Sequence, residues 1–305
     1  MKRKSVVVIL NGISLRRKTF YKTFLPVLSA IADVEVKETL TKNDAVSLAS
    51  KACDHYVDAI LAAGGDGTLN QVVNGVLAGR ETASKLPAIG LIPLGSGNDF
   101  ARTAQVRSDP RQIQSLLERF APKKIDVGVI QFTSSQLHKT ETRYFVNMAD
   151  MGMGPIVVDK VLKSGRALGH AAAYYKSIIA TFFQYKLVEV EAIASDWKWS
   201  GKLRTLGVGN GKYYGHGMGI TPDAILDDRM FHVFICGNVS VFDFIRYTGH
   251  LKKGKHINLP EIHYKTATEI VFTSEKQCLI EGDGEIFGQL PAKVSLLNRQ
   301  LDFLI

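Results

Sequence analysis

Gly64-Gly65-Asp66-Gly67-Thr68-Leu69-Asn70-Gln71 is the stretch that decides the fold of this chain. The residues before it, 58–63, form a short apolar run with the length of a buried strand. Over 69–77, apolar residues recur at three- and four-residue spacing, which predicts a helix with one buried stripe. The glycines therefore occupy a tight strand-to-helix turn, where backbone N–H groups converge. Such a turn is suited to bind an anion such as phosphate.

Three other residues of this turn have a specific meaning. Thr68 and Gln71 have the three-residue spacing of a capping box, so we expect Thr68 to cap the helix. Asp66 is an unusual residue in a loop that binds phosphate alone, and it indicates a metal ion or a hydroxyl group as a further ligand. For this turn taken alone, the alternative is an ordinary glycine turn of an α/β protein.

Strands and helices alternate through the N-terminal part of the chain. This alternation predicts a parallel sheet with helical crossovers. Ligands bind such sheets at the carboxyl ends of the strands, where Asn11, the Gly64 turn and a second glycine turn, 93–99, all lie. The expected strands are 5–10, 34–38, 58–63 and 88–92, and the expected helices are 20–31, 43–56, 69–77 and 110–120.

The pattern changes near Lys124, because most later strands follow one another without helices. A mostly antiparallel β domain is the expected result. The expected strands are 125–131, 144–149, 187–194, 203–209, 230–236, 269–273 and 277–281, with helical stretches at 156–185 and 240–251.

The chain is basic, with a formal net charge of +9. No nucleic-acid-binding motif accompanies this charge, so we expect no nucleic-acid partner. Attraction to anionic lipid headgroups or nucleotide phosphates explains it equally well. The three cysteines are too scattered for a disulfide framework or a zinc site, and no apolar run reaches the length of a membrane span. A cytoplasmic setting is expected.

The second glycine turn makes the phosphate interpretation more specific. Asp66 and Asp99 would then lie close together, each at a helix N-terminus. Paired carboxylates beside glycine turns suit a nucleotide with Mg²⁺, which prefers oxygen ligands. A P-loop is absent from the sequence. A third turn, Glu281-Gly282-Asp283-Gly284-Glu285, is either a solvated hairpin or part of the same chemistry.

The ordered series of motifs resembles that of the soluble bacterial diacylglycerol kinase-like lipid kinases, which are related to diacylglycerol, sphingosine and ceramide kinases. The resemblance spans nearly the whole chain. It rests on 64–68, 93–99, Asp126, Asn210 with its glycines, and 283–285. It implies a nucleotide-binding NAD-kinase-like α/β domain (1–124), a β-sandwich lipid-substrate domain (125–292), and a segment that returns to the first domain (293–305).

The resemblance also implies roles for individual residues. Glu285 matches the proton acceptor of the family, and we expect Asp283 to support it and Asp66 to take part in catalysis. A Mg²⁺ site in the second domain would use Asp228 with the carbonyls of Ile225 and Met230. The expected nucleotide-binding residues are Asn11, Thr39, Gly64, Gly65, Asp66, Gly67, Thr68, Gln71, Gly95, Ser96, Asn98 and Asp99, and the expected catalytic Mg²⁺ ligands are Asp66, Asp99 and Asp126.

The expected function is Mg²⁺-dependent transfer of phosphate from ATP to the hydroxyl of a diacylglycerol-like or sphingoid lipid at a membrane surface, with transient membrane association. A homodimer is left open. The alternatives are an NAD-kinase-like enzyme and a non-catalytic lipid or nucleotide sensor, for which Gln71 and Arg229 are departures from the family pattern. Plain core packing is the preferred interpretation of the aromatic-rich helix that could instead hold the lipid tails, with Tyr174, Tyr175, Ile178, Ile179, Phe182 and Phe183.

Overall fold

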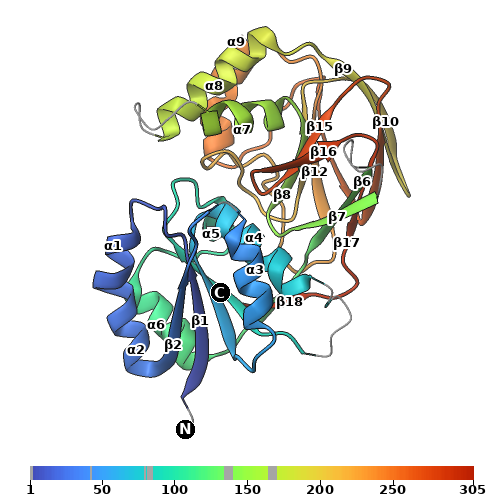
Figure 1. The fold of residues 1–305 in the computed structure, drawn as a ribbon. Coiled ribbons are helices and arrows are strands. Elements are labelled where there is room, and N and C mark those ends of the chain that lie inside the picture. Colours follow the sequence, from blue (N-terminus) through green and yellow to red (C-terminus); the bar gives the residue numbers. More distant parts are fainter. Residues whose placement is uncertain (1–2, 42, 79, 81–84, 134–139, 164–169) are drawn as a thin grey trace. The chain divides into compact units, whose positions relative to one another are not determined.

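The computed structural model describes residues 3–41, 43–78, 80, 85–133, 140–163 and 170–305 (Figure 1). The chain divides into two compact units. Unit 1 contains Met1–Ile125 together with Arg299–Ile305, and unit 2 contains Asp126–Asn298.

A six-stranded sheet, sheet A, forms the centre of unit 1, with the strand order β2-β1-β3-β4-β18-β5. Its neighbouring strands are parallel except for β18 with β5. β1, β3 and β4 are almost wholly buried, as expected for strands in the middle of a parallel sheet. The strands are β1 Lys4–Leu10, β2 Ala32–Glu38, β3 Ala59–Gly64, β4 Ala88–Pro93, β5 Lys123–Ile125 and β18 Leu301–Leu304.

Helices cover both faces of sheet A (Figure 1). α2 and α6 pack on the face that carries Val6, Val8 and Leu10, and α3 packs beside α4 on the other face. The helix expected over 20–31 is divided, and Pro26 stands in the first turn of α2, where the N–H group that proline lacks is not needed for a helical hydrogen bond. The helical segments are α1 Arg17–Thr19, the π-helix η1 Phe20–Phe24, α2 Leu25–Ile31, α3 Asp44–Ala52, α4 Asp66–Leu77, α5 Asp99–Thr103 and α6 Pro110–Arg119.

Two antiparallel sheets form unit 2. Sheet B has the order β10-β9-β14-β17-β6-β7, and sheet C has the order β13-β12-β11-β8-β15-β16. Apolar side chains of both sheets share one core, for example Ile130 and Phe272 of sheet B with Val208 and Phe231 of sheet C. The strands are β6 Gly128–Thr133, β7 Thr140–Phe145, β8 Met148–Gly152, β9 Val188–Ala194, β10 Lys198–Leu203, β11 Thr205–Gly209, β12 Phe231–Cys236, β13 Ile262–Ala267, β14 Glu269–Thr273, β15 Leu279–Gly282, β16 Glu285–Gln289 and β17 Ala292–Leu296.

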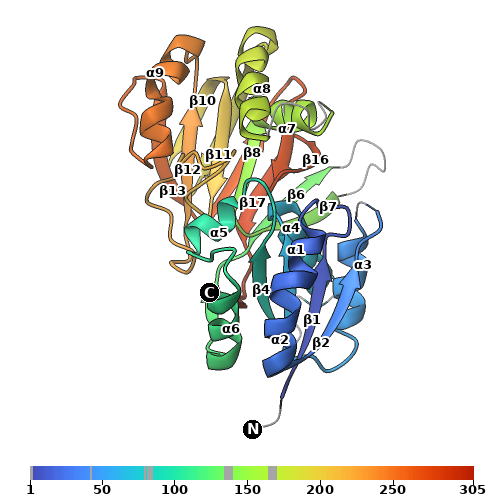
Figure 2. The same cartoon turned by 90° about the vertical axis from the view of Figure 1, so that its left-hand side faces the viewer.

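Three helices cover the other face of sheet C: α7 Met153–Lys163, α8 His170–Gln184 and α9 Val241–Lys252. Figure 2 shows them on the same side of this sheet. They share a second core with the sheet, in which Val157, Ile178 and Leu251 of the helices meet Met148 and Phe234 of the strands. The predicted fold class, a parallel α/β domain with an antiparallel β-sandwich domain, is thus confirmed.

Three expectations about the chain differ from the structure. The strand expected over 144–149 spans the junction between β7 and β8, because Asn147 and the residues beside it are held there by Asp283. The helical stretch 156–185 is two helices, α7 and α8. The part that returns to unit 1 begins at Arg299 rather than residue 293, since β17 pairs with β6 and β14 in sheet B.

Within the part of the chain that the structure describes, no helix is both long and apolar enough to cross a membrane.

Candidate active site

The helix after the first glycine turn begins three residues earlier than the sequence pattern suggested. α4 starts at Asp66, its N-cap is Gly65, and no side chain caps it. The predicted capping box of Thr68 and Gln71 is therefore wrong. The side chain of Thr68 instead packs on Gly64, where a Cβ atom would lie 2.3 Å from Thr68 Oγ1. A glycine is required at position 64 for this close contact.

The two glycine turns of unit 1 touch each other. The N–H groups of Leu94 and Gly95 both donate to the Gly64 carbonyl, at 2.8 and 3.1 Å. A Cβ atom on Gly95 would lie 2.4 Å from the Cα of Gly65, so the backbones approach as closely as only glycine allows. Asn98, at φ 52°, fixes the second turn: its Oδ1 accepts from Gly95 N and its Nδ2 donates to Gly95 O, both at 3.0 Å.

Asp66 joins the first turn to the start of α5. Its Oδ2 accepts from Asp99 N at 3.1 Å and its Oδ1 from Phe100 N at 3.0 Å. The carboxylates of Asp66 and Asp99 lie on the same side of Gly97, since a Cβ there would be 3.2 and 3.6 Å from their Oδ2 atoms. A carboxylate that accepts one hydrogen bond per oxygen keeps lone pairs for another ligand. Asp66 and Asp99 together therefore suit a Mg²⁺ ion that carries a nucleotide.

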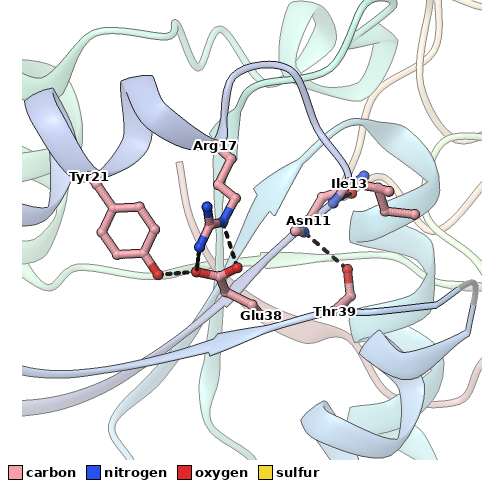
Figure 3. A network of polar contacts seen from close by, with 7 residues as sticks. Asn11, Ile13, Arg17, Tyr21, Glu38 and Thr39 are labelled. Carbon is pink, nitrogen blue, oxygen red and sulfur yellow. Dashed lines mark hydrogen bonds and ion pairs between the residues drawn. The ribbon is translucent and has the colours of Figure 1, made fainter.

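The loop after β1 forms another edge of this site (Figure 3). Asn11 Nδ2 donates to Thr68 Oγ1 at 3.4 Å, and Asn11 Oδ1 accepts from Ile13 N at 3.2 Å. Thr39 is buried and its Oγ1 accepts from Gly12 N at 3.2 Å. Side chains that follow β1, β2 and β3 are thereby brought to one end of sheet A.

A charged cluster of Arg17, Tyr21 and Glu38 lies beside the same loop (Figure 3). Arg17 donates to both carboxylate oxygens of Glu38, at 2.6 and 3.0 Å, and the Tyr21 hydroxyl donates to Glu38 as well. The hydrogen bonds from Arg17 and Tyr21 lower the pKa of Glu38. This cluster ties the start of the first helical segment to the end of β2.

The start of α4 is the part of unit 1 that can bind an anion. Leu69 N donates to Gly65 O at 3.1 Å as the first bond of the helix, so the N–H groups of Asp66, Gly67 and Thr68 precede that bond. These groups, with the helix dipole behind them, suit a phosphate. Of the other predicted residues, Ser96 is exposed in the second turn and Gln71 is half-buried further along α4.

In unit 2, the acidic turn is a tight β-hairpin. Gly282 pairs with Glu285, and the two residues between them, Asp283 and Gly284, both have positive φ, 52° and 86°. Two such residues form a type I′ turn. The hairpin interpretation of the local chain is therefore correct, but the turn does not point freely into solvent, since Asp283 is buried.

Asp283 binds the backbone between β7 and β8. Its carboxylate accepts hydrogen bonds from the N–H groups of Val146 (2.9 Å), Asn147 (3.0 Å) and Met148 (2.9 Å). Its own N–H donates to the Met148 carbonyl at 2.8 Å. Bonds to a charged acceptor are about twice as strong as neutral ones, so Asp283 fixes the hairpin against this junction. Glu285, the first residue of β16, is thereby given a defined position.

Asp126 does not fit the magnesium site expected for it. It lies in unit 2 and its side chain is wholly buried, where the Arg229 N–H and guanidinium donate to its two oxygens at 2.7 and 3.0 Å. Asn210 Nδ2 in turn donates to the carbonyls of Asp126 and Val146, at 3.0 and 2.9 Å. The carboxylate of Asp126 thus neutralises Arg229, and Arg229 contacts both of its oxygens.

The second expected metal site finds little support either. Asp228 Oδ1 accepts from Met230 N at 3.1 Å, and its Oδ2 lies 3.4 Å from His232 Nε2. Ile225 and Met230 are exposed. Among the described residues, no group of three or more His, Cys, Asp and Glu side chains could hold a metal ion. Both carboxylate oxygens of Asp228 thus contact neighbouring residues, and the metal site at Asp228 stays a prediction.

Sequence reasoning missed a buried acidic pair in unit 2. Asp150 of β8 lies directly opposite Glu281 of β15 in the antiparallel ladder, and both side chains are fully buried. Burial raises the pKa of Asp150 to about 7, and burial, then the nearby Asp150, raise the pKa of Glu281 well above its usual range. Asp150 Oδ2, Glu281 Oε1 and the Tyr214 hydroxyl have no hydrogen-bond partner in the described part of the chain. One sign of this pair is visible in the sequence, because Asp150 stands inside the otherwise apolar run 148–152.

Unit 1 is thus an α/β unit whose paired glycine turns suit a phosphate, and unit 2 is a β-sandwich that presents a fixed acidic hairpin. Residues 5–130 match the model of the diacylglycerol kinase catalytic domain, and residues 149–305 match that of the YegS C-terminal NAD kinase beta sandwich-like domain. The chain therefore belongs to the diacylglycerol kinase-like family of kinases.

Individual proteins give the same assignment. The chain is 28% identical to "Probable lipid kinase YegS-like" of Stenotrophomonas maltophilia, over 83% of this chain and 80% of that protein. It is 29% identical to a diacylglycerol kinase of Bacillus subtilis, over 86% and 82%. The fold is similar to a crystal structure of a diacylglycerol kinase from Bacillus anthracis (TM-score 0.75, 20% identity, 100% and 97% covered). It is more distantly similar to yeast NADH kinase (TM-score 0.54, 9% identity, 99% and 84% covered).

Proposed function

We propose that this chain is a lipid kinase that uses ATP and Mg²⁺ to phosphorylate the hydroxyl group of a diacylglycerol-like or sphingoid lipid. The observation that carries the proposal is the family match over both units. The paired glycine turns in unit 1 and the fixed acidic hairpin in unit 2 support it, because each provides one half of the chemistry that such a reaction needs.

The residues of unit 1 bind and orient the nucleotide. The N–H groups at the start of α4 hold phosphate oxygens, and Asp66 and Asp99 would hold the Mg²⁺ ion. That ion, when bound, neutralises the negative charge of the phosphates. Asn11 and Thr39 keep the loop after β1 in place around the nucleotide. Asp66 itself is oriented by the two N–H groups of α5, so it is ready for its ligand before binding.

The carboxylate of Glu285 acts as the general base. The oxygen of the lipid hydroxyl attacks the γ-phosphorus, the bond to the bridging oxygen of ADP breaks, and the hydroxyl proton passes to Glu285. Asp283 positions Glu285 through its three bonds to the β7–β8 junction. A positioned base is needed because a lipid hydroxyl does not ionise near neutral pH.

Apolar side chains of unit 2 surround a cavity between sheet C and its helices. Tyr174, Ile178 and Phe182 of α8 line it with Phe244 and Tyr247 of α9. Its volume, about 90 Å³, is smaller than the ~150 Å³ cavity known to hold benzene, so a full acyl chain requires the helices to shift. Of the residues considered for lipid tails, Phe183 is instead exposed, and the rest of the proposal does not depend on it.

The test is a panel of acceptors with γ-labelled ATP and Mg²⁺. Diacylglycerol, a sphingoid base, ceramide and a glycerophospholipid would be presented in detergent micelles, with NAD as a separate arm. We expect label in one lipid fraction. Label in the dinucleotide would establish the NAD-kinase alternative. Nucleotide or lipid binding without transfer to any acceptor would establish a sensor instead.

A further inference from the structure

α8 and α9 lie side by side and run in opposite directions. The rings of Phe182 and Phe244 are 5.4 Å apart, and at the other end the Lys252 ammonium lies 4.8 Å from the centre of the Tyr175 ring. Their inner sides pack on sheet C and line the apolar cavity. Their outer sides carry exposed residues, and we call these outer sides together the α8–α9 face.

One end of the α8–α9 face is apolar and exposed. Phe183 of α8 is 75% exposed, and Phe242 and Ile245 of α9 are 79% and 55% exposed. Phe183 directly follows Phe182, and Phe242 and Ile245 flank Phe244, so the contact between Phe182 and Phe244 places all three at the same end. Large exposed apolar groups gathered in this way mark an interaction surface.

The other end of the face is basic. The exposed side of α9 continues from Ile245 through Arg246 and His250 to Lys252 and Lys253. Lys176 on α8 is exposed as well. None of these Lys and Arg residues forms an ion pair with a carboxylate among the residues the structure describes. The cations are therefore available to an anionic partner.

We infer that the α8–α9 face binds an anionic lipid bilayer, which rests on the proposed function and adds to it the surface through which unit 2 reaches its substrate. Phe183, Phe242 and Ile245 enter the boundary between headgroups and acyl chains, and Arg246, Lys252 and Lys253 bind anionic headgroups. The cavity lies beneath the same two helices, so a bound lipid would meet it from this side.

Charge favours a bilayer over a second copy of the chain. The sequence carries a net charge of +9, and two copies that met through this face would bring unpaired cations together. An anionic bilayer neutralises the same cations and buries the apolar end. A combination of aromatic side chains and cations is typical of proteins that lie on a membrane surface.

The experiment measures sedimentation of the full chain with vesicles of phosphatidylcholine alone or mixed with phosphatidylglycerol. One variant is Phe242→Ser with Ile245→Ser, and the other is Lys252→Glu with Lys253→Glu. Leu40→Ser and Lys51→Glu are matched controls, since both residues are exposed in unit 1. We expect the wild type to bind the mixed vesicles and each double variant to bind roughly tenfold or more weakly. High salt should weaken the wild type, and both controls should bind normally.

Failure of this inference differs from failure of the proposed function. Phosphorylation of lipid in detergent micelles should remain in both double variants, because none of their residues lines the cavity or the proposed site. If the wild type transfers no phosphate yet binds vesicles through this face, only the proposed function fails. Unchanged vesicle binding by both double variants, or no binding by the wild type, overturns the inference. A dimer that the variants dissociate, without vesicle binding, would assign the face to a second copy.

Discussion

Two turns of this molecule contain the letters Gly-Asp-Gly, and they differ in the element that each turn enters. Gly65-Asp66-Gly67 leads into the helix α4, whereas Gly282-Asp283-Gly284 leads into the strand β16. In both, the aspartate accepts hydrogen bonds from the backbone of another segment, two for Asp66 and three for Asp283. The aspartate is thus first a structural clamp in each turn.

The element after each turn decides what the turn offers to a ligand. A helix leaves the N–H groups of its first turn without partners, so the turn of Asp66 keeps donors for phosphate. The donors of the hairpin already have partners: Gly284 N donates to Glu281 Oε2 at 2.6 Å, and Asp283 N donates to Met148 O at 2.8 Å. The first turn therefore offers N–H donors to a ligand, and the second presents the side chain that comes next, Glu285.

The largest expected effect concerns Glu285, the residue that follows the second turn. Glu285→Gln keeps the size of the side chain and cannot accept a proton, so kcat should fall by ~10²–10⁴-fold while nucleotide affinity changes little. Steady-state kinetics with the acceptor found in the lipid panel measure the first quantity, and calorimetric titration of nucleotide measures the second. Full activity of Glu285→Gln would mean that the turn is only a hairpin.

A second experiment removes the carboxylate of Asp283 and leaves the proposed base, Glu285, unchanged. Asp283→Ala deprives three backbone N–H groups of their acceptor, and hydrogen bonds to a charged group contribute about 1.5–3 kcal/mol each. We expect the free energy of unfolding of unit 2 to fall by roughly 3 kcal/mol or more. Urea unfolding followed by tryptophan fluorescence is suitable, because Trp197 and Trp199 belong to unit 2. Asp283→Asn keeps one oxygen acceptor and should be milder.

If Asp283→Asn instead abolishes turnover while Glu285→Gln remains active, the base is Asp283 and the roles within this turn are reversed. The stability measurement separates this outcome from simple loss of structure, since a folded but inactive Asp283→Asn protein would have a nearly normal unfolding curve.

Asp150, which faces Glu281 beside the second turn, should make the stability of unit 2 depend on pH. Burial raises the pKa of Asp150 from 3.8 to about 7, so the folded state binds a proton that the unfolded state releases. This contribution is fully present below pH 3.8 and is lost as pH rises through about 7, at up to about 1.4 kcal/mol per pH unit. Urea unfolding at a series of pH values should show the decline, and Asp150→Asn should flatten it. An unchanged decline in Asp150→Asn would assign it to Glu281.

The smallest change in stability is expected at the first turn. Asp66→Asn keeps one acceptor oxygen for the start of α5 and should destabilise unit 1 by only about 1–2 kcal/mol. Its loss of charge should nevertheless lower ATP-dependent turnover strongly, since Mg²⁺ prefers a carboxylate. Thermal unfolding and turnover are the measurements. Wild-type turnover in this variant would show that Asp66, like Asp283, only holds the backbone of another segment in place.

Local sequence patterns predicted what lies close along the chain. The alternation of apolar runs predicted β1 to β4 of sheet A, and glycines at the ends of β3 and β4 located the two glycine turns. The helix expected over 110–120 is observed as α6, which Asp109 caps by accepting from Arg111 N at 3.0 Å, with Pro110 at the first helical position.

Contacts between distant residues could not be predicted in this way. The partners of Asp66 at Asp99 and Phe100, and those of Asp283 at the β7–β8 junction, depend on which loops the fold brings together. The facing of Asp150 and Glu281 depends on strand register, which a single sequence does not specify. The same limitation explains why the sequence predicts a metal ligand at Asp126, whose carboxylate forms an ion pair with Arg229.

The strand β18 has a consequence for how the chain is made. Leu301–Leu304 lies between β4 and β5 in sheet A, and the ring of Phe303 packs 5.5 Å from that of Phe100. During translation, β1 to β4 leave the ribosome long before this strand, so the sheet of unit 1 carries an open edge while the whole of unit 2 is synthesised. An open, apolar edge is a site of aggregation. The nascent chain must therefore protect this edge until Leu301–Leu304 has been synthesised, and a message cut short near codon 299 would yield a unit 1 that lacks an interior strand.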